Sequence, residues 1–493
     1  MDTRFAISEY HDTAAITAKL DALIKKPIYS IRKDALEDYV ENYFNKKCVK
    51  SKEMIEEAKT VIPGGVQHNL AFNYPFPLVF TKAQGAKLYD IDGNEYYDFL
   101  QAGGPTILGS NMPAVKDAVI DLLNDCGPST GLFHEYEYKL AKKISDCVPS
   151  VEMFRMLGSG TEACMCAVRV ARLATKKKNI LKMGGAYHGW SDQLAWGIRV
   201  PGTKNLQSHG VPGFVFKHTQ EFFPNDLKDL ERKLKINQFR GGTAAVFIEP
   251  VGPESGTRPV DKDFAKGVQA LCRKYGALLV FDEVVTAFRI GVSGAQGYFG
   301  VDPDITIFGK IIAGGYPGAG GIGGHREVMK YLGAGLDSSG KKVHKAMCGG
   351  TMAATPISCV AGYTAICEIE RTNACQVAGQ MGDRLVKGLN EIIKKYDLPF
   401  VCYNQGSICH LHTVATMHFS INWKKPWEIF HVLKETGARQ KEMEHMGAAY
   451  MAEGIVTLAG SRLYTSAAYT EEMIDDVLVR FDRVMSKVGL IQD

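Results

Sequence analysis

Short apolar runs alternate with longer amphipathic stretches between about residues 125 and 370. The runs lie at 151–157, 179–183, 244–250, 277–281 and 304–308. Near-continuous apolar strands that alternate with helices are typical of a largely parallel sheet covered by helices on both faces. The pattern therefore predicts an α/β fold in this part of the chain.

The two ends of the chain carry a mixed pattern. Residues 32–44 have helical spacing, and 85–100 predicts two strands joined at Asp92-Gly93, a hairpin turn signal. Apolar residues after Thr470 keep one helical stripe, which predicts a last helix that begins there.

Composition narrows the class of protein. The 493 residues are 45% hydrophobic and 23% charged, and 58 basic against 54 acidic residues leave a net charge of only +4. With no long basic run, we expect neither nucleic acid nor membrane as a partner. No stretch nears 18 uninterrupted apolar residues, and the first residues lack a signal pattern. The 12 cysteines include no CxxC pair, so we expect reduced thiols and a cytoplasmic protein.

Polar chemistry follows several of the apolar runs, where ligands of open α/β sheets gather. Gly158, Ser159, Gly160 and Thr161 lie between a predicted strand and a predicted helix. Free N–H groups and the helix dipole at such a start bind phosphate. The Gly-Lys-[Ser/Thr] element of a P-loop is missing, and a plain strand-to-helix turn is the alternative.

Two further residues belong to the possible site. Tyr187 follows two glycines and can cover a planar ring or pack in the core. Asp282 directly follows a buried strand and needs a cation or several donors, such as a protonated ring nitrogen or a metal. Glu283 points to the other side of the strand, so Asp282 is favoured.

Lys310 follows the run at 304–308 and precedes a glycine-rich tract. A solvated loop lysine is the simplest interpretation, but a buried lysine loses its charge readily and attacks carbonyls. A phosphate cradle, a ring cover, an acid for a ring nitrogen and a lysine are together the groups that pyridoxal 5′-phosphate requires. The sequence therefore predicts this cofactor.

These stretches resemble the class III, fold type I pyridoxal-phosphate aminotransferases, in particular the glutamate-1-semialdehyde aminomutase branch. The resemblance rests on 158–172, 186–189, 247–251, 278–289, 304–324 and 349–362. It implies a homodimer whose large cofactor domain spans 125–370. It also implies a small α+β domain from 61–124 and 371–493, preceded by a helical extension over 1–60.

The resemblance assigns roles to single residues. It implies that Lys310 forms the Schiff base, Asp282 pairs with the pyridinium nitrogen and Tyr187 stacks on the ring, so these three are the expected catalytic residues. The other expected cofactor contacts are Ser159, Gly160 and Thr161 at the phosphate, Val284 below the ring, and Gly350 and Thr351 at the phosphate across the dimer interface. His188 belongs to the same motif as Tyr187, and we expect it to pack beside the site.

Departures from the branch concern the substrate. The arginine that aminomutases carry after the 63–66 stretch is replaced by Ala71. Glu254 stands where aminomutases have Asn and ω-aminotransferases have a Glu that pairs with an arginine. Arg462 falls close to that arginine, and a surface arginine is the alternative interpretation. Glu254 and Arg462 are therefore the candidate substrate residues.

Two histidines, His410 and His412, lie at strand spacing with His418 close by. A metal site is conceivable there, but no acidic or cysteine ligand is near, and we expect no metal. The sequence as a whole predicts a pyridoxal-phosphate enzyme that moves an amino group between an amine or amino acid and a keto or aldehyde acceptor. An aminomutase or an amino-acid racemase or epimerase is the first alternative, and a non-catalytic binding protein on this fold is the second.

Overall fold

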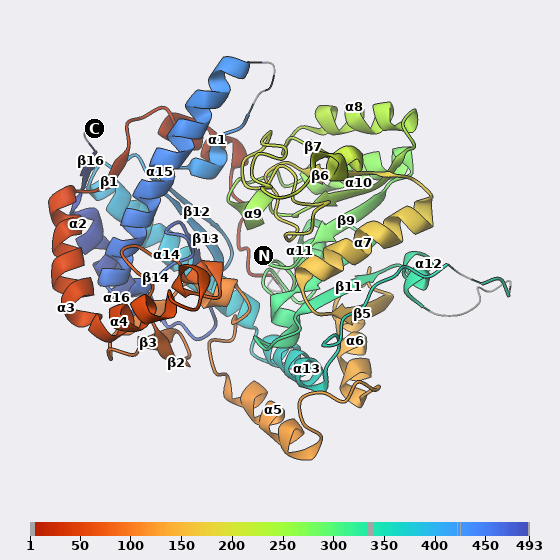
Figure 1. Ribbon diagram of the computed structural model, residues 1–493, viewed down its shortest axis with the longest axis horizontal. Coiled ribbons are helices and arrows are strands. Elements are labelled where there is room, and N and C mark those ends of the chain that lie inside the picture. Colours follow the sequence, from red (N-terminus) through yellow and green to blue (C-terminus); the bar gives the residue numbers. More distant parts are fainter. Residues whose placement is uncertain (1–4, 334–339, 343, 422, 424, 492–493) are drawn as a thin grey trace.

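The computed structural model describes residues 5–333, 340–342, 344–421, 423 and 425–491. Its centre is a seven-stranded sheet with strand order β5-β11-β10-β9-β8-β6-β7 (Figure 1). The strands are β5 (Met153–Leu157), β6 (Asn179–Met183), β7 (Thr219–Phe222), β8 (Thr243–Ile248), β9 (Leu278–Asp282), β10 (Ile305–Gly309) and β11 (Gly320–Gly324). All neighbours are parallel except the two pairs that β11 makes with β10 and β5. The predicted, mostly parallel α/β sheet is confirmed.

Helices cover both faces of this sheet. Ala245 and Phe247 pack with α7 (Gly160–Thr175), whereas Val246 and Ile248 pack with α8 (Leu227–Gln238) and α10 (Phe264–Tyr275) on the other face (Figure 1). Because both faces are buried, β6 and β8 read as continuous apolar runs rather than as alternating ones. Within the described part of the chain, no helix is both long and apolar enough to cross a bilayer.

The strand β11 was not predicted, because four of its five residues are glycine. A Cβ atom on Gly320 would lie 2.2 Å from the carbonyl oxygen of Ser159. The glycines therefore let β11 approach the turn between β5 and α7, where a side chain would push the two backbones apart. The sequence signal for a strand is absent here because close approach, not side-chain packing, selects the residues.

The two ends of the chain share a second hydrophobic core, called here the terminal core, made from residues 31–99 and 381–485. Its strands form three small sheets. The first pairs β1 (Tyr29–Ile31) with β16 (Val488–Leu490), and the second contains β2 (Phe80–Gln84), β3 (Lys87–Asp90), β4 (Glu95–Asp98) and β14 (Ile455–Val456). The third contains β12 (Val401–Gln405), β13 (Ile408–His412) and β15 (Arg462–Tyr464). The main helices of the terminal core are α2 (Lys33–Tyr39), α4 (Val49–Ala58), α14 (Ala374–Lys395), α15 (Pro426–Ala452) and α16 (Glu471–Met485). The hairpin at Asp92-Gly93 is confirmed as β3–β4.

The predicted last helix is also confirmed. The Thr470 side chain accepts a hydrogen bond from the Met473 N–H group and so caps α16. The predicted helix over 32–44 is present as α2 followed by a π-helical turn at Val40–Phe44. The domain boundaries at 60, 124 and 370 stay predictions.

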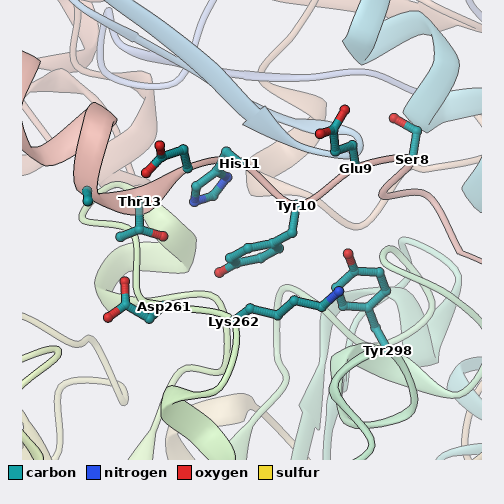
Figure 2. Close-up of a pocket in the computed structure, with 10 residues that line it drawn as sticks. Ser8, Glu9, Tyr10, His11, Thr13, Asp261, Lys262 and Tyr298 are labelled. Carbon is teal, nitrogen blue, oxygen red and sulfur yellow. The ribbon is translucent and has the colours of Figure 1, made fainter.

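The helix α13 (Pro356–Arg371) packs against both α5 (Pro113–Asp125) and α6 (Glu135–Cys147). The N-terminal segment runs from the large sheet to the terminal core and continues into α1 (Thr13–Leu23). The Tyr10 hydroxyl donates to the Val260 carbonyl oxygen at 2.7 Å, and Asp21 accepts from His418 at 2.7 Å. Figure 2 shows the open hollow of about 470 Å³ that this segment lines together with Lys262 and Tyr298. The N-terminal segment thus contacts both the large sheet domain and the part of the chain that forms the terminal core.

We expect Gly320→Ala to destabilise the cofactor-free protein, because the added Cβ meets the backbone of Ser159, which no side-chain rotation relieves. The loss should reach about 2–4 kcal/mol, the range of overpacked cores and strained backbones. Thermal unfolding of the cofactor-free protein measures it. Gly437→Ala is the matched control, because nothing lies within 4 Å of its Cβ position and it sits inside α15. Equal melting temperatures for the two variants would contradict the prediction.

Candidate active site

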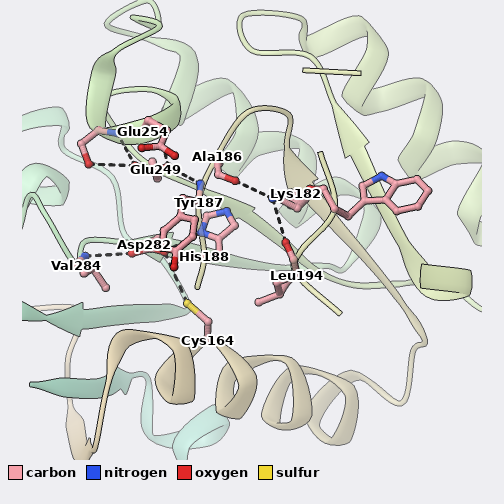
Figure 3. Close-up of polar contacts among 12 residues, drawn as sticks. Cys164, Lys182, Ala186, Tyr187, His188, Leu194, Glu249, Glu254, Asp282 and Val284 are labelled. Carbon is pink, nitrogen blue, oxygen red and sulfur yellow. Dashed lines mark hydrogen bonds and ion pairs between the residues drawn. The ribbon is translucent and has the colours of Figure 1, made fainter. Parts of the chain in front are cut away.

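The carboxyl ends of five strands meet at one edge of the large sheet. They carry the 159–161 turn after β5, the Tyr187-His188 pair after β6, Glu249 after β8, Asp282 at the end of β9 and Lys310 after β10. Figure 3 shows several of these side chains gathered beside the start of α7. Parallel strands therefore bring together groups that lie up to 151 positions apart in the chain.

The turn after β5 forms the start of α7. Ser159 is the N-cap, and its hydroxyl accepts from the Glu162 N–H group at 3.2 Å. Gly160 lies against Val284, since a Cβ atom there would come 3.0 Å from the valine Cγ2. Thr161 packs under Gly189 in the same way, so the turn contacts both neighbouring segments. Exposed N–H groups at the start of a 16-residue helix favour an anion such as phosphate.

The segment with Tyr187 is held in place by a buried lysine. Lys182 Nζ donates to the carbonyl oxygens of Ala186 and Trp196 at 2.7 Å each and of Leu194 at 3.2 Å (Figure 3). Burial lowers the pKa of Lys182 to about 8. The Tyr187 side chain is 46% exposed in the single chain, so one face of its ring is free to cover a planar group.

Asp282 is buried, with 6% of its surface exposed. Its Oδ2 accepts from His188 Nδ1 at 2.7 Å and from Cys164 Sγ at 3.7 Å, and its Oδ1 accepts from the Val284 N–H group at 3.1 Å. Burial lowers the pKa of His188, so the ring is neutral and carries its hydrogen on Nδ1. The His188 ring therefore orients the Asp282 carboxylate.

Glu283 is turned away from this site, as predicted from strand alternation. Its carboxylate accepts from the N–H groups of Ala295 and Gln296 and from the Thr286 hydroxyl. The group Cys164, His188 and Asp282 is the one set of possible metal ligands within 4.8 Å of one another in the described residues. His410 and His412 instead stack on Tyr403 in the interior of the terminal core's sheet β12–β13–β15.

Lys310 lies directly after β10, with a positive φ of 51°. Its Nζ donates to the Gly103 carbonyl oxygen at 2.5 Å. Burial lowers its pKa; the Tyr464 hydroxyl opposes this shift, and the Arg462 and Arg289 cations add to it. A lysine in this position is a better nucleophile than a solvated one, because more of it is neutral at a given pH.

The turn that receives Lys310 is fixed by a buried arginine. Arg289 is fully buried, and its guanidinium donates to the Gly104 carbonyl oxygen at 2.6 Å and to Gln101 Oε1 at 3.0 Å. It also donates to the Ser407 hydroxyl and the Thr465 carbonyl oxygen, and lies 4.9 Å from the centre of the Tyr464 ring. Burial lowers the pKa of Arg289 to about 10. Its contacts join the large sheet to the terminal core beside Lys310.

Glu254 and Arg462 form an ion pair. Arg462 Nη2 lies 2.9 Å from Glu254 Oε2, and Arg462 Nη1 donates to the Glu254 carbonyl oxygen at 3.0 Å. Their side chains are only 14% and 12% exposed, so Arg462 is not a surface arginine. The Glu254 N–H group donates to the same Glu249 oxygen as the Tyr187 N–H group, which places the ion pair beside the segment that carries Tyr187.

The remaining predicted positions lie around the site's opening. Ala71 is exposed at the end of a short turn, whose Leu70 side chain lies 3.1 Å from the Cβ position of Gly103. Gly350 and Thr351 are exposed in the single chain, and the Cβ position of Gly350 lies 3.3 Å from Glu162 Oε2 of the same chain. Their reach to a second subunit stays a prediction.

Sequence reasoning assigned no role to Glu249, Lys182 or Arg289. Glu249 follows a buried strand directly, which is the same signal that identified Asp282. Lys182 lies inside an apolar run, where a single charge among buried residues was the available signal. Arg289 gave no such signal, because it belongs to an irregular segment after β9.

A phosphorylated aldehyde cofactor with a basic ring nitrogen finds a partner for each of its groups along this edge. The helix-start N–H groups would bind the phosphate, Asp282 would pair with the nitrogen, Tyr187 would cover the ring, and Lys310 would supply the amine. This arrangement is that of a fold type I pyridoxal-phosphate enzyme.

Comparison with known proteins gives the family. The family model "Aminotransferase class-III" matches residues 70–455, and the chain belongs to this family. The expectation of a pyridoxal-phosphate enzyme of class III is therefore confirmed.

Among curated relatives, glutamate-1-semialdehyde 2,1-aminomutase of Acetivibrio thermocellus is 42% identical over 70% of this chain and 79% of its own. An aminomutase of the same name from Macrococcus caseolyticus is 35% identical over 89% of this chain and 99% of its own. Among solved structures, an ω-transaminase from Sphaerobacter thermophilus has a TM-score of 0.78 at 28% identity, covering 90% of this chain and 99% of its own.

We expect Lys310 in the cofactor-free protein to capture pyridoxal phosphate with a pH midpoint below 10.5, because its pKa is lowered and the neutral amine is the reactive form. The initial rate of the absorbance change on mixing measures this capture from about pH 6 to about pH 11, in steps of about one pH unit. Lys310→Ala is the control for reaction at other lysines. A midpoint at or above that of an exposed lysine would contradict the assignment.

Proposed function

We propose that this enzyme transfers an amino group between an amine or amino acid and a keto or aldehyde acceptor, and that at least one partner carries a carboxylate. The observation that carries the proposal is the buried Glu254–Arg462 pair beside the segment that carries Tyr187. An arginine that is neutralised by a neighbouring glutamate can turn to a substrate carboxylate and turn back for an uncharged group. Two substrates of different charge can then use one site.

Each residue of the proposed site has a separate role in this reaction. Bound pyridoxal phosphate supplies an aldehyde that condenses with amines and a ring that accepts electron density. Lys310 Nζ would act as the general base that removes a proton from the substrate carbon and then as the general acid that returns it. Asp282, oriented by His188, would pair with the ring nitrogen. Tyr187 and Val284 would hold the ring, and Ser159, Gly160 and Thr161 would bind the phosphate.

Isomerisation is the second candidate, because curated relatives at 35–42% identity are named glutamate-1-semialdehyde 2,1-aminomutases. The absence of an arginine at Ala71 favours amino transfer between two molecules over this reaction. A screen of amino donors and keto acceptors on the holoenzyme, with glutamate-1-semialdehyde as one substrate, separates the two. Turnover that requires an added acceptor supports the proposal. Conversion of glutamate-1-semialdehyde alone, without an acceptor, would contradict it.

We further propose that the enzyme is a cytoplasmic homodimer. The exposure of Gly350 and Thr351 in the single chain supports a contact with a second subunit, and 12 free cysteines support a reducing compartment. Sedimentation that finds fully loaded, active monomers would contradict the dimer. Fractionation that finds the protein outside the cytoplasm would contradict the compartment.

Arg462→Ala should weaken transition-state binding of a carboxylate-bearing substrate by about 2–4 kcal/mol, the cost expected when a buried charge pair loses one member. An uncharged amine should lose far less, because it makes no ion pair with the guanidinium. The ratio of kcat/KM values for the two substrates measures the difference. Arg462→Lys is the matched variant, which keeps the charge but loses the bidentate fork. Equal losses for both substrates would show that Arg462 does not select the carboxylate.

A further inference from the structure

Glu249 is a buried carboxylate that accepts hydrogen bonds from two separate segments. It lies directly after β8, with 6% of its surface exposed. Its Oε1 accepts from the Tyr187 N–H group at 3.0 Å and from the Glu254 N–H group at 2.9 Å. Its Oε2 accepts from the Ser255 N–H group at 2.5 Å and from the Ser255 hydroxyl at 3.1 Å (Figure 3). Glu249 Oε1 thus links the segment that carries Tyr187 to the segment that carries Glu254.

The second of these segments is strained. Glu254 and Ser255 both have positive φ, 51° and 53°, which non-glycine residues rarely adopt. The Glu249 carboxylate holds both of their N–H groups, and Arg462 holds the Glu254 side chain and carbonyl oxygen from the other side. The position of Glu254 therefore depends on a balance between Glu249 and Arg462.

A charge on Glu249 is costly. Burial, together with the nearby Asp282 and Glu254 carboxylates, raises the pKa of Glu249 to about 7, although the Tyr187 and Ser255 N–H groups oppose the shift. A glutamine of the same shape would avoid this cost, but its amide has only one acceptor oxygen. In either orientation its NH2 group would face an N–H group of the 254–255 segment, that of Ser255 at the Oε2 position or that of Glu254 at the Oε1 position, so this segment would lose a hydrogen bond. The need for two acceptor oxygens explains why a carboxylate stands here.

We propose that Glu249 is a positioning residue that couples the Glu254–Arg462 pair to Tyr187, so that the state of the ion pair changes how the cofactor ring is covered. The proposal rests on the proposed roles of Tyr187 and Arg462. When Arg462 turns to a substrate carboxylate, Glu254 loses both of its contacts with the guanidinium. Glu249 alone then holds the strained segment. Any shift of the Glu254 N–H group then moves Glu249 Oε1, which also accepts from the Tyr187 N–H group.

A double-mutant cycle on the holoenzyme, without substrate, tests this coupling. Its variants are Glu249→Gln, Arg462→Ala and the double variant, and its readouts are the visible circular dichroism of bound pyridoxal phosphate and the rate of its release. We expect Arg462→Ala alone to change the dichroism and to alter the release rate about threefold, a coupling of ordinary size for connected residues. In the Glu249→Gln background the same substitution should leave both readouts nearly unchanged.

Glu221→Gln is the matched control. Glu221 is a part-buried carboxylate on β7 that accepts from the Gly202 N–H group at 2.9 Å, and among the described residues it makes no hydrogen bond to Tyr187 or Glu254. In its background Arg462→Ala should change both readouts as fully as in the wild type. If Arg462→Ala has the same effect with Glu249→Gln as without it, or no effect in the wild type, Glu249 does not couple the two segments and the proposal is wrong.

If Glu249→Gln does not fold, a second variant replaces it. Glu249→Asp keeps the charge but is one methylene shorter, so it cannot reach both segments, and the same cycle with Asp carries the same two outcomes. No substrate is converted in these measurements. The result therefore stands apart from the donor and acceptor screen, and the coupling can be wrong while the amino-transfer reaction is right, or the reverse.

Discussion

The guanidinium of Arg289 lies fully buried between the large sheet and the terminal core, with no carboxylate partner among the described residues. A buried cation of this kind is tolerated only when many dipoles surround it, and here carbonyl, amide and hydroxyl oxygens and the Tyr464 ring do so. Those dipoles come from segments far apart in the chain. Because these groups must all reach the Arg289 guanidinium, they fix the turn at 101–104. Lys310 Nζ donates to a carbonyl oxygen of that turn.

The same principle applies to the rest of the site. Lys182 and Glu249 are buried charges that bind backbone groups rather than each other, and each holds the segment that carries Tyr187. Buried charges of this type are costly, and they persist where they fix a geometry that apolar packing cannot fix. The segment that carries the proposed ring cover is thus held in place by buried ions.

The sequence predicted those parts of the structure that follow from local pattern. Asp282 and Lys310 were found because a polar residue directly after a buried strand must lie at the sheet's carboxyl edge. The Glu254–Arg462 contact was anticipated only through resemblance, since 208 positions separate the two residues. The strand β11 was missed because its glycines are selected by close approach of backbones, and Arg289 was missed because its partners come from three distant segments. What local pattern cannot supply is the set of long-range contacts that place one segment on another.

The central claim is that the cofactor is bound to Lys310 at this edge of the sheet. Reduction of the holoenzyme with borohydride, followed by peptide mapping, tests it most directly, because reduction fixes the cofactor permanently on the lysine that carries it. The account predicts the label on the peptide that contains Lys310. A label on Lys182, the other buried lysine of the site, or on an exposed lysine would contradict it.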